Sequence, residues 1–289
     1  MNEADLADKE RRLHEALKRY GRVAIGFSGG VDSTLLLRVA RDVLGPEQVL
    51  AVIADTPSLP RKEFAEARAL ADAMGVVCEV IHPDELDDPR YAENSKDRCY
   101  FCKKHLFARI AALASERGVG VVLDGNNADD AGDYRPGRRA AAELGVQSPL
   151  LEAGLTKAEI RALSARAGLP TAEKPAMACL ASRIPYGAPV TAEALGQVEH
   201  AEEALKAAGF AHCRVRHHGD VARIEVPEAD LQRAVAAEER RLIVETVKAA
   251  GFRYVALDLQ GYRTGSMNEA FCASQKKQDG RLTVHARIG

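Results

Sequence analysis

The sequence has no long apolar run. No segment of its 289 residues approaches the roughly 18 to 20 consecutive apolar residues that a membrane-spanning helix needs. The first 20 residues are charged throughout and lack the apolar centre of a signal peptide. We therefore expect a cytoplasmic protein that begins with an amphipathic helix and has no membrane partner.

An excess of charge of either sign is also missing. Lys and Arg number 40 against 42 Asp and Glu, which leaves a formal net charge of -2. Such a balance gives no general attraction to polyanions, so a nucleic-acid partner would need a local basic patch. The composition favours a small-molecule substrate and argues against nucleic acid.

The Walker sequence G-x-x-x-x-G-K-[ST] is absent, which disfavours γ-phosphate transfer by a P-loop kinase or GTPase. Instead, the segment AIGFSGGVDSTLLL places a glycine and serine loop between a buried strand and an apolar helix. Paired glycines let backbone amides approach an anion closely, and the helix N-terminus adds partial positive charge. We predict that ATP binds here by its phosphates, with Asp32 helping to place Mg²⁺, through Gly26, Ser28, Gly29, Gly30, Asp32 and Ser33.

Four apolar runs, at 23–27, 49–54, 76–81 and 119–123, alternate with helical patterns. This alternation predicts an α/β fold with a parallel sheet covered on both faces and a ligand at the switch point, where the loops after strands one and four adjoin. Asp55 and Thr56, after the second strand, are candidates for adenosine contact or for a simple strand cap. Asn127 is a nucleotide-binding candidate after the fourth strand, where Asp129 and Asp130 suit Mg²⁺ or an ordinary Asx turn.

A second, smaller unit is expected after this sheet. Thr156 and Glu159 form a T-x-x-E capping box that starts a helix, and the segment IPYGAP at 184–189 suits a linker. Beyond it the patterns predict a helix at 194–208, a hairpin of 212–217 with 221–226, one helix at 229–249 and a strand at 253–258. We expect an α/β domain at 1–187 and an α+β domain at 188–289.

Six cysteines in a cytosolic chain favour metal binding or thiol chemistry over a disulfide framework. Cys78, Cys213 and Cys272 suit small structural positions. Cys99 and Cys102 form a C-x-x-C pair at the start of a basic helical stretch. Cys179 stands near Lys174 and Arg183, whose charge would favour a reactive thiolate.

Two arginines alternate on a predicted strand of the second unit. Arg214 and Arg216 therefore share one face, where they either clamp a substrate phosphate or form a solvated basic surface. Arg263 and Ser266, in QGYRTGSMNE, are weaker candidates for substrate contact, since they also suit a turn.

Taken together, several strings of the sequence resemble the LarE-type sulfur transferases of the PP-loop ATP pyrophosphatase superfamily. They run from near Gly21 to near Glu269 and comprise GFSGGVDSTLL, DGNNADDAGDYRPG, SPLLEAGLTKAEIR, KPAMACLASRIPYG, RVRHHGDVARIE and LDLQGYRTGSMNE. The resemblance implies that AMP is transferred from ATP to the carboxylates of pyridinium-3,5-biscarboxylic acid mononucleotide, which then become thiocarboxylates of the nickel-pincer nucleotide. It also implies a homo-oligomer, and transient contacts with other maturation enzymes of that cofactor.

The cysteines decide which branch of this family the chain resembles. Cys179 matches the cysteine that single-cysteine members sacrifice as sulfur donor, but the additional Cys99 and Cys102 resemble the cluster-bearing members. The resemblance thus implies a 4Fe-4S cluster on Cys99, Cys102 and Cys179, with zinc, a dithiol or a sacrificed Cys179 as alternatives. The expected catalytic residues are Cys179, Asp32 and Arg183, and the expected substrate-binding residues are Ser182, Arg183, Arg214, Arg216, Arg263 and Ser266.

Three other functions fit parts of the sequence. A tRNA thiolase also combines such a loop with cysteines, but the second unit has acidic helices where RNA would need a basic face. An ammonia-using ligase similar to the synthetase halves of NAD or GMP synthesis needs no cysteines. A non-catalytic nucleotide-binding module would release neither AMP nor pyrophosphate.

Overall fold

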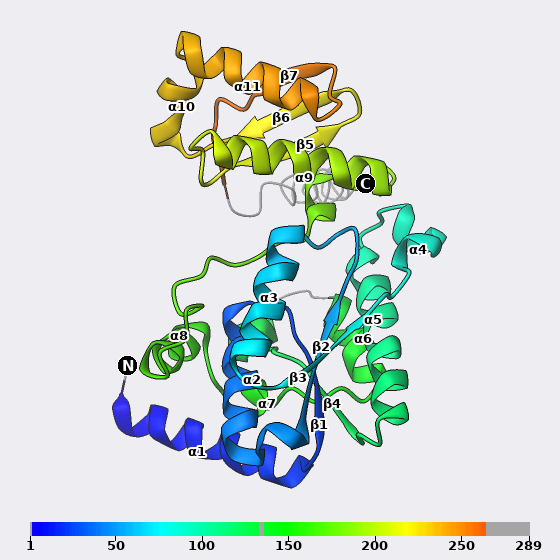
Figure 1. Cartoon of the computed structure of the whole chain (residues 1–289), viewed down its shortest axis with the longest axis vertical. Coiled ribbons are helices and arrows are strands. Elements are labelled where there is room, and N and C mark those ends of the chain that lie inside the picture. Colours follow the sequence, from blue (N-terminus) through cyan, green and yellow to red (C-terminus); the bar gives the residue numbers. More distant parts are fainter. Residues whose placement is uncertain (1, 133–135, 264–289) are drawn as a thin grey trace, which may run out of the picture. The chain divides into compact units, whose positions relative to one another are not determined.

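A computed structural model describes residues 2–132 and 136–263 (Figure 1). The chain divides into two compact units, one ending at Cys179 and the other beginning at Leu180. Within the described ranges, none of the helices combines the length and the apolar character needed to cross a membrane.

The first unit is built on a parallel sheet of four strands in the order β3-β2-β1-β4. Its strands are β1 (Val23–Gly26), β2 (Val49–Ala54), β3 (Val77–Ile81) and β4 (Val121–Leu123). The chain moves from β1 outward to β3 and then crosses back to place β4 on the other side of β1. The predicted parallel α/β sheet is confirmed, and its switch point lies between β1 and β4.

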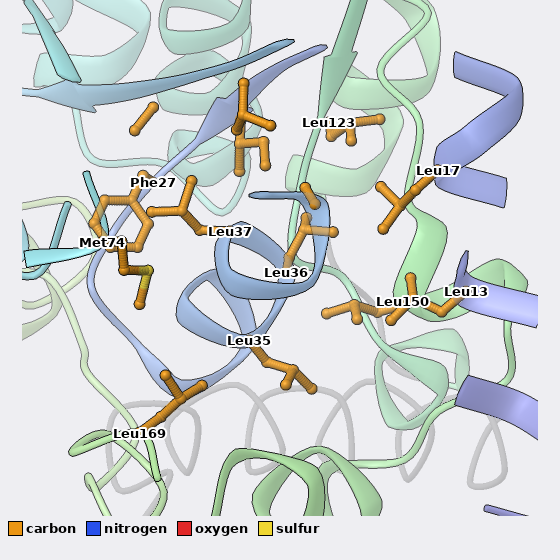
Figure 2. Packing of buried hydrophobic residues seen from close by; sticks show 14 of the residues in the cluster. Leu13, Leu17, Phe27, Leu35, Leu36, Leu37, Met74, Leu123, Leu150 and Leu169 are labelled. Carbon is orange, nitrogen blue, oxygen red and sulfur yellow. The ribbon is translucent and has the colours of Figure 1, made fainter. Parts of the chain in front are cut away.

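Helices cover both faces of this sheet because side chains of a strand alternate between its two sides. On one face, Ile25 of β1 and the leucines of α2 belong to a large buried cluster, in which Leu36 and Leu37 are fully buried (Figure 2). On the other face, Ala24 packs with Phe107 and Ile110. The first face carries α1 (Glu3–Tyr20), α2 (Val31–Leu44), α3 (Arg61–Ala73) and α8 (Lys157–Arg166), and the second carries α5 (Arg98–Glu116) and α6 (Pro136–Glu143).

Short helices connect these elements. They are η1 (Pro46–Gln48), η2 (Glu85–Asp87), α4 (Pro89–Ala92), η3 (Ala128–Gly132) and α7 (Pro149–Glu152). Two residues other than glycine have positive φ within the described chain, Asp84 at 52° and Asn94 at 56°. Both flank η2 and α4, so the segment that leads into α5 contains unusual backbone conformations.

The second unit consists of a three-stranded sheet in the order β5-β6-β7, with helices packed on it. The predicted hairpin is present as antiparallel β5 and β6, and β7 pairs parallel to β6. The elements are η4 (Leu180–Arg183), α9 (Ala192–Ala207), β5 (Arg214–His218), β6 (Val221–Glu225), α10 (Glu228–Val235), α11 (Ala237–Ala249) and β7 (Tyr254–Leu257).

The prediction of one helix at 229–249 is wrong. Ala236 has an extended backbone, with φ of -60° and ψ of 148°, and separates α10 from α11. Glu238 and Glu239 then lie in the first turn of α11, where the helix dipole favours negative charge. These two acidic residues mark a helix start that apolar periodicity alone does not reveal.

The capping box that starts α8 is confirmed. The Thr156 hydroxyl accepts from the Glu159 amide at 3.4 Å, and the Glu159 carboxylate accepts from the Thr156 amide at 2.8 Å. These bonds satisfy two amides that a helix N-terminus otherwise leaves without partners.

We expect Thr156→Ala to lower the free energy of unfolding by about 1 kcal/mol, because the Glu159 amide loses its acceptor. Urea denaturation of the full chain, followed by circular dichroism, measures this change. Thr156→Ser keeps the hydroxyl and serves as the control. Equal losses in the two variants would contradict the assignment of the stabilisation to the cap.

Candidate active site

The loop between β1 and α2 leaves the start of a helix open. Gly30 precedes α2 and makes no side-chain capping bond, so backbone amides of the first turn remain available to an anion. Gly29 has φ of 68°, and a Cβ atom built on it would lie 2.9 Å from the Cβ of Ala67 in α3. Both its conformation and its close packing therefore require glycine at position 29.

Two serine hydroxyls lie together in this loop. The Oγ atoms of Ser28 and Ser33 are 3.1 Å apart, and Ser33 also donates to the carbonyl of Gly30 at 3.2 Å. The Gly30 amide approaches the Ser28 hydroxyl at 3.4 Å. Amides and hydroxyls thus gather at one helix N-terminus, as a pyrophosphate site requires.

Gly26, a predicted nucleotide-binding residue, packs against α5. As the last residue of β1, it faces α5, and a Cβ there would lie 3.4 Å from Ile110 and 3.5 Å from Phe107. Its small size lets α5 pack closely on the sheet, and its contact with the nucleotide stays a prediction.

The switch point brings Asp32 together with residues from two later segments. The Asn127 side-chain amide donates to Asp32 at 3.2 Å, and the Lys157 ammonium forms an ion pair with the same carboxylate. Lys157 was not among the predicted site residues. It is the first residue of α8, and its place in the T-K-A-E string directly after the capping Thr156 is the one signal that the sequence offers.

The predicted magnesium residues are engaged with backbone amides. The Asp130 carboxylate is buried and accepts from the Asn127 amide at 3.0 Å, and the Asp129 carboxylate accepts from the Lys157 amide at 2.8 Å. Among the described residues there is no group of three or more His, Cys, Asp or Glu arranged to hold a metal ion. Magnesium at Asp129 and Asp130 therefore stays a prediction, and Asp32 is the carboxylate that lies at the loop itself.

The loop after β2 is fixed to α3 and to η2. Arg61 forms an ion pair with Asp55 and donates to the Thr56 carbonyl at 2.6 Å. The Thr56 side chain hydrogen-bonds the carboxyl group of Glu85, whose pKa is raised by burial. Asp55 and Thr56 thus have structural partners, and their contact with adenosine stays a prediction.

Of the three cysteines singled out from the sequence, Cys99 and Cys102 lie on α5 and Cys179 ends the same unit. Cys99 and Cys179 are exposed, whereas Cys102 is partly buried. Burial raises the pKa of the Cys102 thiol to about 12, Lys103 opposes this shift, and the charges of Cys179, Glu85 and Cys99 add to it.

The segment that leads to Cys179 runs beside the phosphate loop. Lys174 forms ion pairs with Glu63 at 2.6 Å and with Glu66 at 2.9 Å, which fasten it to α3. The methyl group of Met177 lies 3.9 Å from the position that a Cβ of Gly30 would take. Cys179 thus follows, by two residues, a side chain that lies near Gly30 of the phosphate loop.

The cations expected to activate Cys179 have carboxylate partners. Burial acts to lower the pKa of Lys174, but the bonds with Glu63 and Glu66 outweigh it and raise that pKa. In the second unit the buried Arg183 forms a bidentate pair with Glu202, at 2.9 and 3.0 Å. Neutralisation by these carboxylates weakens the predicted electrostatic effect of both cations on a thiolate.

The arginines of β5 differ in their surroundings. Arg216 is buried, forms an ion pair with Glu225 at 2.7 Å and donates to the carbonyl of Ser182 at 3.1 Å. Arg214 is partly buried and lies over the ring of Tyr262, 5.4 Å from its centroid. The phosphate clamp stays a prediction that would need Arg216 to exchange or share its carboxylate partner.

Of the two remaining substrate-binding candidates, Arg263 and Ser266, the structure describes only the first. Arg263 is the last described residue and is partly buried. Ser266, like Cys272, lies outside the described residues. The substrate contacts predicted for Arg263 and Ser266 stay predictions.

Cys99, Cys102 and Cys179 are the residues predicted to hold an iron-sulfur cluster. Three thiols from one unit suit iron by their chemistry, since soft thiolate ligands hold such clusters. Their arrangement does not form a ready-made metal site in the part of the chain that the structure describes. The cluster on Cys99, Cys102 and Cys179 therefore stays a prediction.

Gly29→Ala should weaken ATP binding about tenfold or more, because an L-residue at this φ and in this contact adds strain of about 1 to 3 kcal/mol to the loop. Gly21→Ala is the matched control, since Gly21 has nearly the same φ, 67°, with nothing within 4 Å of its added Cβ. Titration with a fluorescent ATP analogue measures both. Equal affinities in the two variants would show that the contact with Ala67 does not shape the site.

Comparison with known proteins places these features in a family. The family model described as NAD synthase matches residues 7–181, more than half of the chain. An uncharacterized protein of Synechocystis sp. is 42% identical over 91% of this chain and 98% of its own length. The pyridinium-3,5-bisthiocarboxylic acid mononucleotide synthase of Lactiplantibacillus plantarum is 40% identical over 94% of this chain and 98% of its own length.

A tRNA-specific 2-thiouridylase of Azorhizobium caulinodans is also similar, at 30% identity, but over only 53% of this chain and 49% of its own length. The similarity to the mononucleotide synthase extends instead through both structural units. With its parallel sheet and its SGG loop at the start of α2, the chain belongs to the LarE-type sulfur transferases, ATP-using enzymes of the PP-loop superfamily.

Proposed function

We propose that this protein inserts sulfur into pyridinium-3,5-biscarboxylic acid mononucleotide, converting its carboxylates to thiocarboxylates at the expense of ATP. The observation that carries the proposal is that Cys99, Cys102 and Cys179 belong to the same unit as the phosphate loop, with the methyl group of Met177 3.9 Å from the position that a Cβ of Gly30 would take. The name of the relative from Lactiplantibacillus plantarum, which matches along nearly its whole length, supports this substrate.

In the first step a substrate carboxylate oxygen attacks the α-phosphorus of ATP, the bond to the β-phosphate breaks, and pyrophosphate leaves. The open amides of α2 and the hydroxyls of Ser28 and Ser33 are suited to hold that pyrophosphate. Mg²⁺, when bound, neutralises phosphate charge, and Asp32 is the loop carboxylate suited to hold it. Lys157, now paired with Asp32, would then be released to contact a phosphate.

In the second step sulfur replaces AMP on the activated carbon. With Cys179 as donor, its thiolate attacks the acyl adenylate and AMP leaves, which forms a thioester. Loss of the Cα proton and cleavage of the Cβ–S bond then release the thiocarboxylate and leave dehydroalanine at position 179. Cys99, Cys102 and Cys179 are the residues that would hold a 4Fe-4S cluster, and such a cluster would supply sulfide in place of the sulfur of Cys179.

The deciding experiment incubates anaerobically purified protein, with and without iron and sulfide reconstitution, with Mg-ATP and the biscarboxylic mononucleotide. Intact masses of the product and of the protein are then recorded. A thiocarboxylate product with a protein lighter by one H₂S supports sacrifice of Cys179, and a product with unchanged protein mass supports the cluster. Absence of thiolated product under both conditions would refute the proposed function, and thiolation of bulk tRNA instead would assign the chain to the tRNA thiolases.

Lys157→Ala is expected to slow exchange of pyrophosphate into ATP by about 100-fold. This is the usual loss of rate when one group that stabilises developing charge in the transition state is removed. The control is Lys9→Ala, which removes another partly buried lysine paired with α8, through Glu159 at 2.8 Å, away from the loop. Similar exchange rates in the two variants would show that Lys157 serves only to balance the charge of Asp32.

Cys179→Ala should abolish thiocarboxylate formation while leaving AMP and pyrophosphate formation within about twofold of the parent, because the thiol acts only after adenylation. Cys78→Ala is the control, since Cys78 lies on β3 and burial raises the pKa of its thiol to about 11. If Cys179→Ala lost adenylation as well, the division of the reaction into two steps at two sets of residues would be wrong.

A further inference from the structure

The loop after β4 brings Asn127 to the Asp32 carboxylate, and a residue that was not among the predicted site residues fixes the start of this loop. Asp124 follows β4 directly and is only 7% exposed. Its amide donates to the carbonyl of Gln147 at 3.0 Å, and Leu123 forms a parallel bridge with the same Gln147. The backbone at the start of the loop is thus bonded to a segment that lies beside β4.

The Asp124 side chain bonds both the loop and this neighbouring segment. One carboxylate oxygen accepts from the Asn126 amide at 3.1 Å and from the Ser148 hydroxyl at 2.7 Å, and the other accepts from the side-chain amide of Asn126 at 2.6 Å. Both oxygens of this buried carboxylate therefore have donors, which offsets the cost of removing it from water. Asp124 closes the turn over residues 124–126 and joins it to Ser148.

The turn that Asp124 closes leads directly to the phosphate loop. A Cβ on Gly125 would lie 3.3 Å from the Cβ of Asp32, so the backbone of the turn packs against the first turn of α2. Asn127 follows, only 2% exposed, and its side-chain amide donates to the Asp32 carboxylate at 3.2 Å. The conformation of the turn therefore sets the position from which Asn127 reaches Asp32.

The orientation of Asn127 depends on the loop around it. Its side-chain oxygen accepts from the Asp129 amide at 3.0 Å, which leaves its side-chain nitrogen to face Asp32. Its backbone amide donates to Asp130 at 3.0 Å, and the Ala128 amide bonds the next segment. Beyond Asn127 the loop is thus held by backbone amides, and before Asn127 it is held by the carboxylate at its start.

We propose that Asp124 is a positioning residue for adenylation, whose carboxylate fixes the turn over residues 124–126 so that Asn127 orients the Asp32 carboxylate at the phosphate loop. This inference deepens the proposed function and rests on its adenylation step. Because Asp124 acts through Asn127, substitutions of the two residues should have effects that do not add.

The test is a double-mutant cycle in the full-length protein, with Mg-ATP, the biscarboxylic mononucleotide and exchange of pyrophosphate into ATP as the measured rate. We expect Asp124→Ala to slow exchange about tenfold, because a displacement of about 1 Å costs a catalytic group up to roughly 100-fold in rate. In a protein that already carries Asn127→Ala, the same change should slow exchange by less than about twofold. Losses that multiply in the double variant would overturn the proposal.

Asp88→Ala is the matched control. Asp88 is also 7% exposed, and its carboxylate also accepts from the amide two residues later, that of Arg90 at 2.9 Å. This substitution should leave the exchange rate within about twofold of the parent, because Asp88 caps α4 and not the loop after β4. Slowing equal to that of Asp124→Ala would indicate a general loss of structure and would overturn the assignment.

Asp124→Asn tests the role of the hydrogen bonds through a conservative change. Asparagine keeps one acceptor oxygen for the Asn126 amide and Ser148, and its new amide group can donate to the Asn126 side chain once that side chain turns over. We therefore expect Asp124→Asn to recover the exchange rate to within about threefold of the parent. A rate as low as that of Asp124→Ala would contradict positioning through these bonds.

Ser148→Ala decides the question if Asp124→Ala does not fold. It removes one of the donors to Asp124 and leaves the carboxylate in place. We expect exchange to slow about threefold, the effect of losing one hydrogen bond, and to stay unchanged when Ser148→Ala is added to Asn127→Ala. Equal slowing in both backgrounds would overturn the proposal.

Binding of a fluorescent ATP analogue, which needs no second substrate, separates this inference from the proposed function. If the parent shows no exchange with the biscarboxylic mononucleotide, the proposed function fails, while the binding cycle still decides the role of Asp124. Asp124→Ala and Asn127→Ala should then each weaken binding about fivefold, and the double variant should bind within about twofold of either one. Unchanged binding in Asp124→Ala, or losses that multiply, would overturn the inference.

Discussion

The position of β1 between β2 and β4 is the constraint on which the rest of the first unit depends. Parallel strands end at the same edge of a sheet, so this order makes the loops after β1 and β4 neighbours although about 95 residues separate Asp32 from Asn127. The third partner, Lys157, reaches the same point from the start of α8. A site for a charged ligand is thus assembled by strand order, and each contributing segment supplies only one or two side chains.

Close backbone packing gives this site its shape. A Cβ on Gly125, after β4, would lie 3.1 Å from the Ser33 amide nitrogen, so glycine there lets the two loops approach. The helix dipole and the open amides of α2 therefore act where the loops after β1 and β4 pack closely against each other. The thiols belong to α5 and to the segment after α8, so the proposed sulfur chemistry would take place on different elements from the proposed phosphate chemistry.

Local patterns predicted the fold well, because each depends on residues close in sequence. The four strands, the SGG loop and the Thr156 cap are of this kind. The ion pair of Lys157 with Asp32 was missed because it joins residues 125 positions apart, and the carboxylates that neutralise Lys174 belong to a helix more than 100 residues away. The sequence shows which cations lie near Cys179 along the chain, but their net electrostatic effect on its thiol depends on the carboxylates that pair with them.

The contact between Gly29 and Ala67 also limits how this loop can change over evolution. Glycine and alanine are the two smallest residues, so the pair has a single compensating exchange, in which position 67 becomes glycine to make room for alanine at 29. That exchange would put glycine inside α3, at a cost of roughly 0.5 to 1 kcal/mol, and would leave the backbone strain at position 29 in place. The nucleotide loop therefore restricts the composition of a helix that contributes no residue to the predicted chemistry.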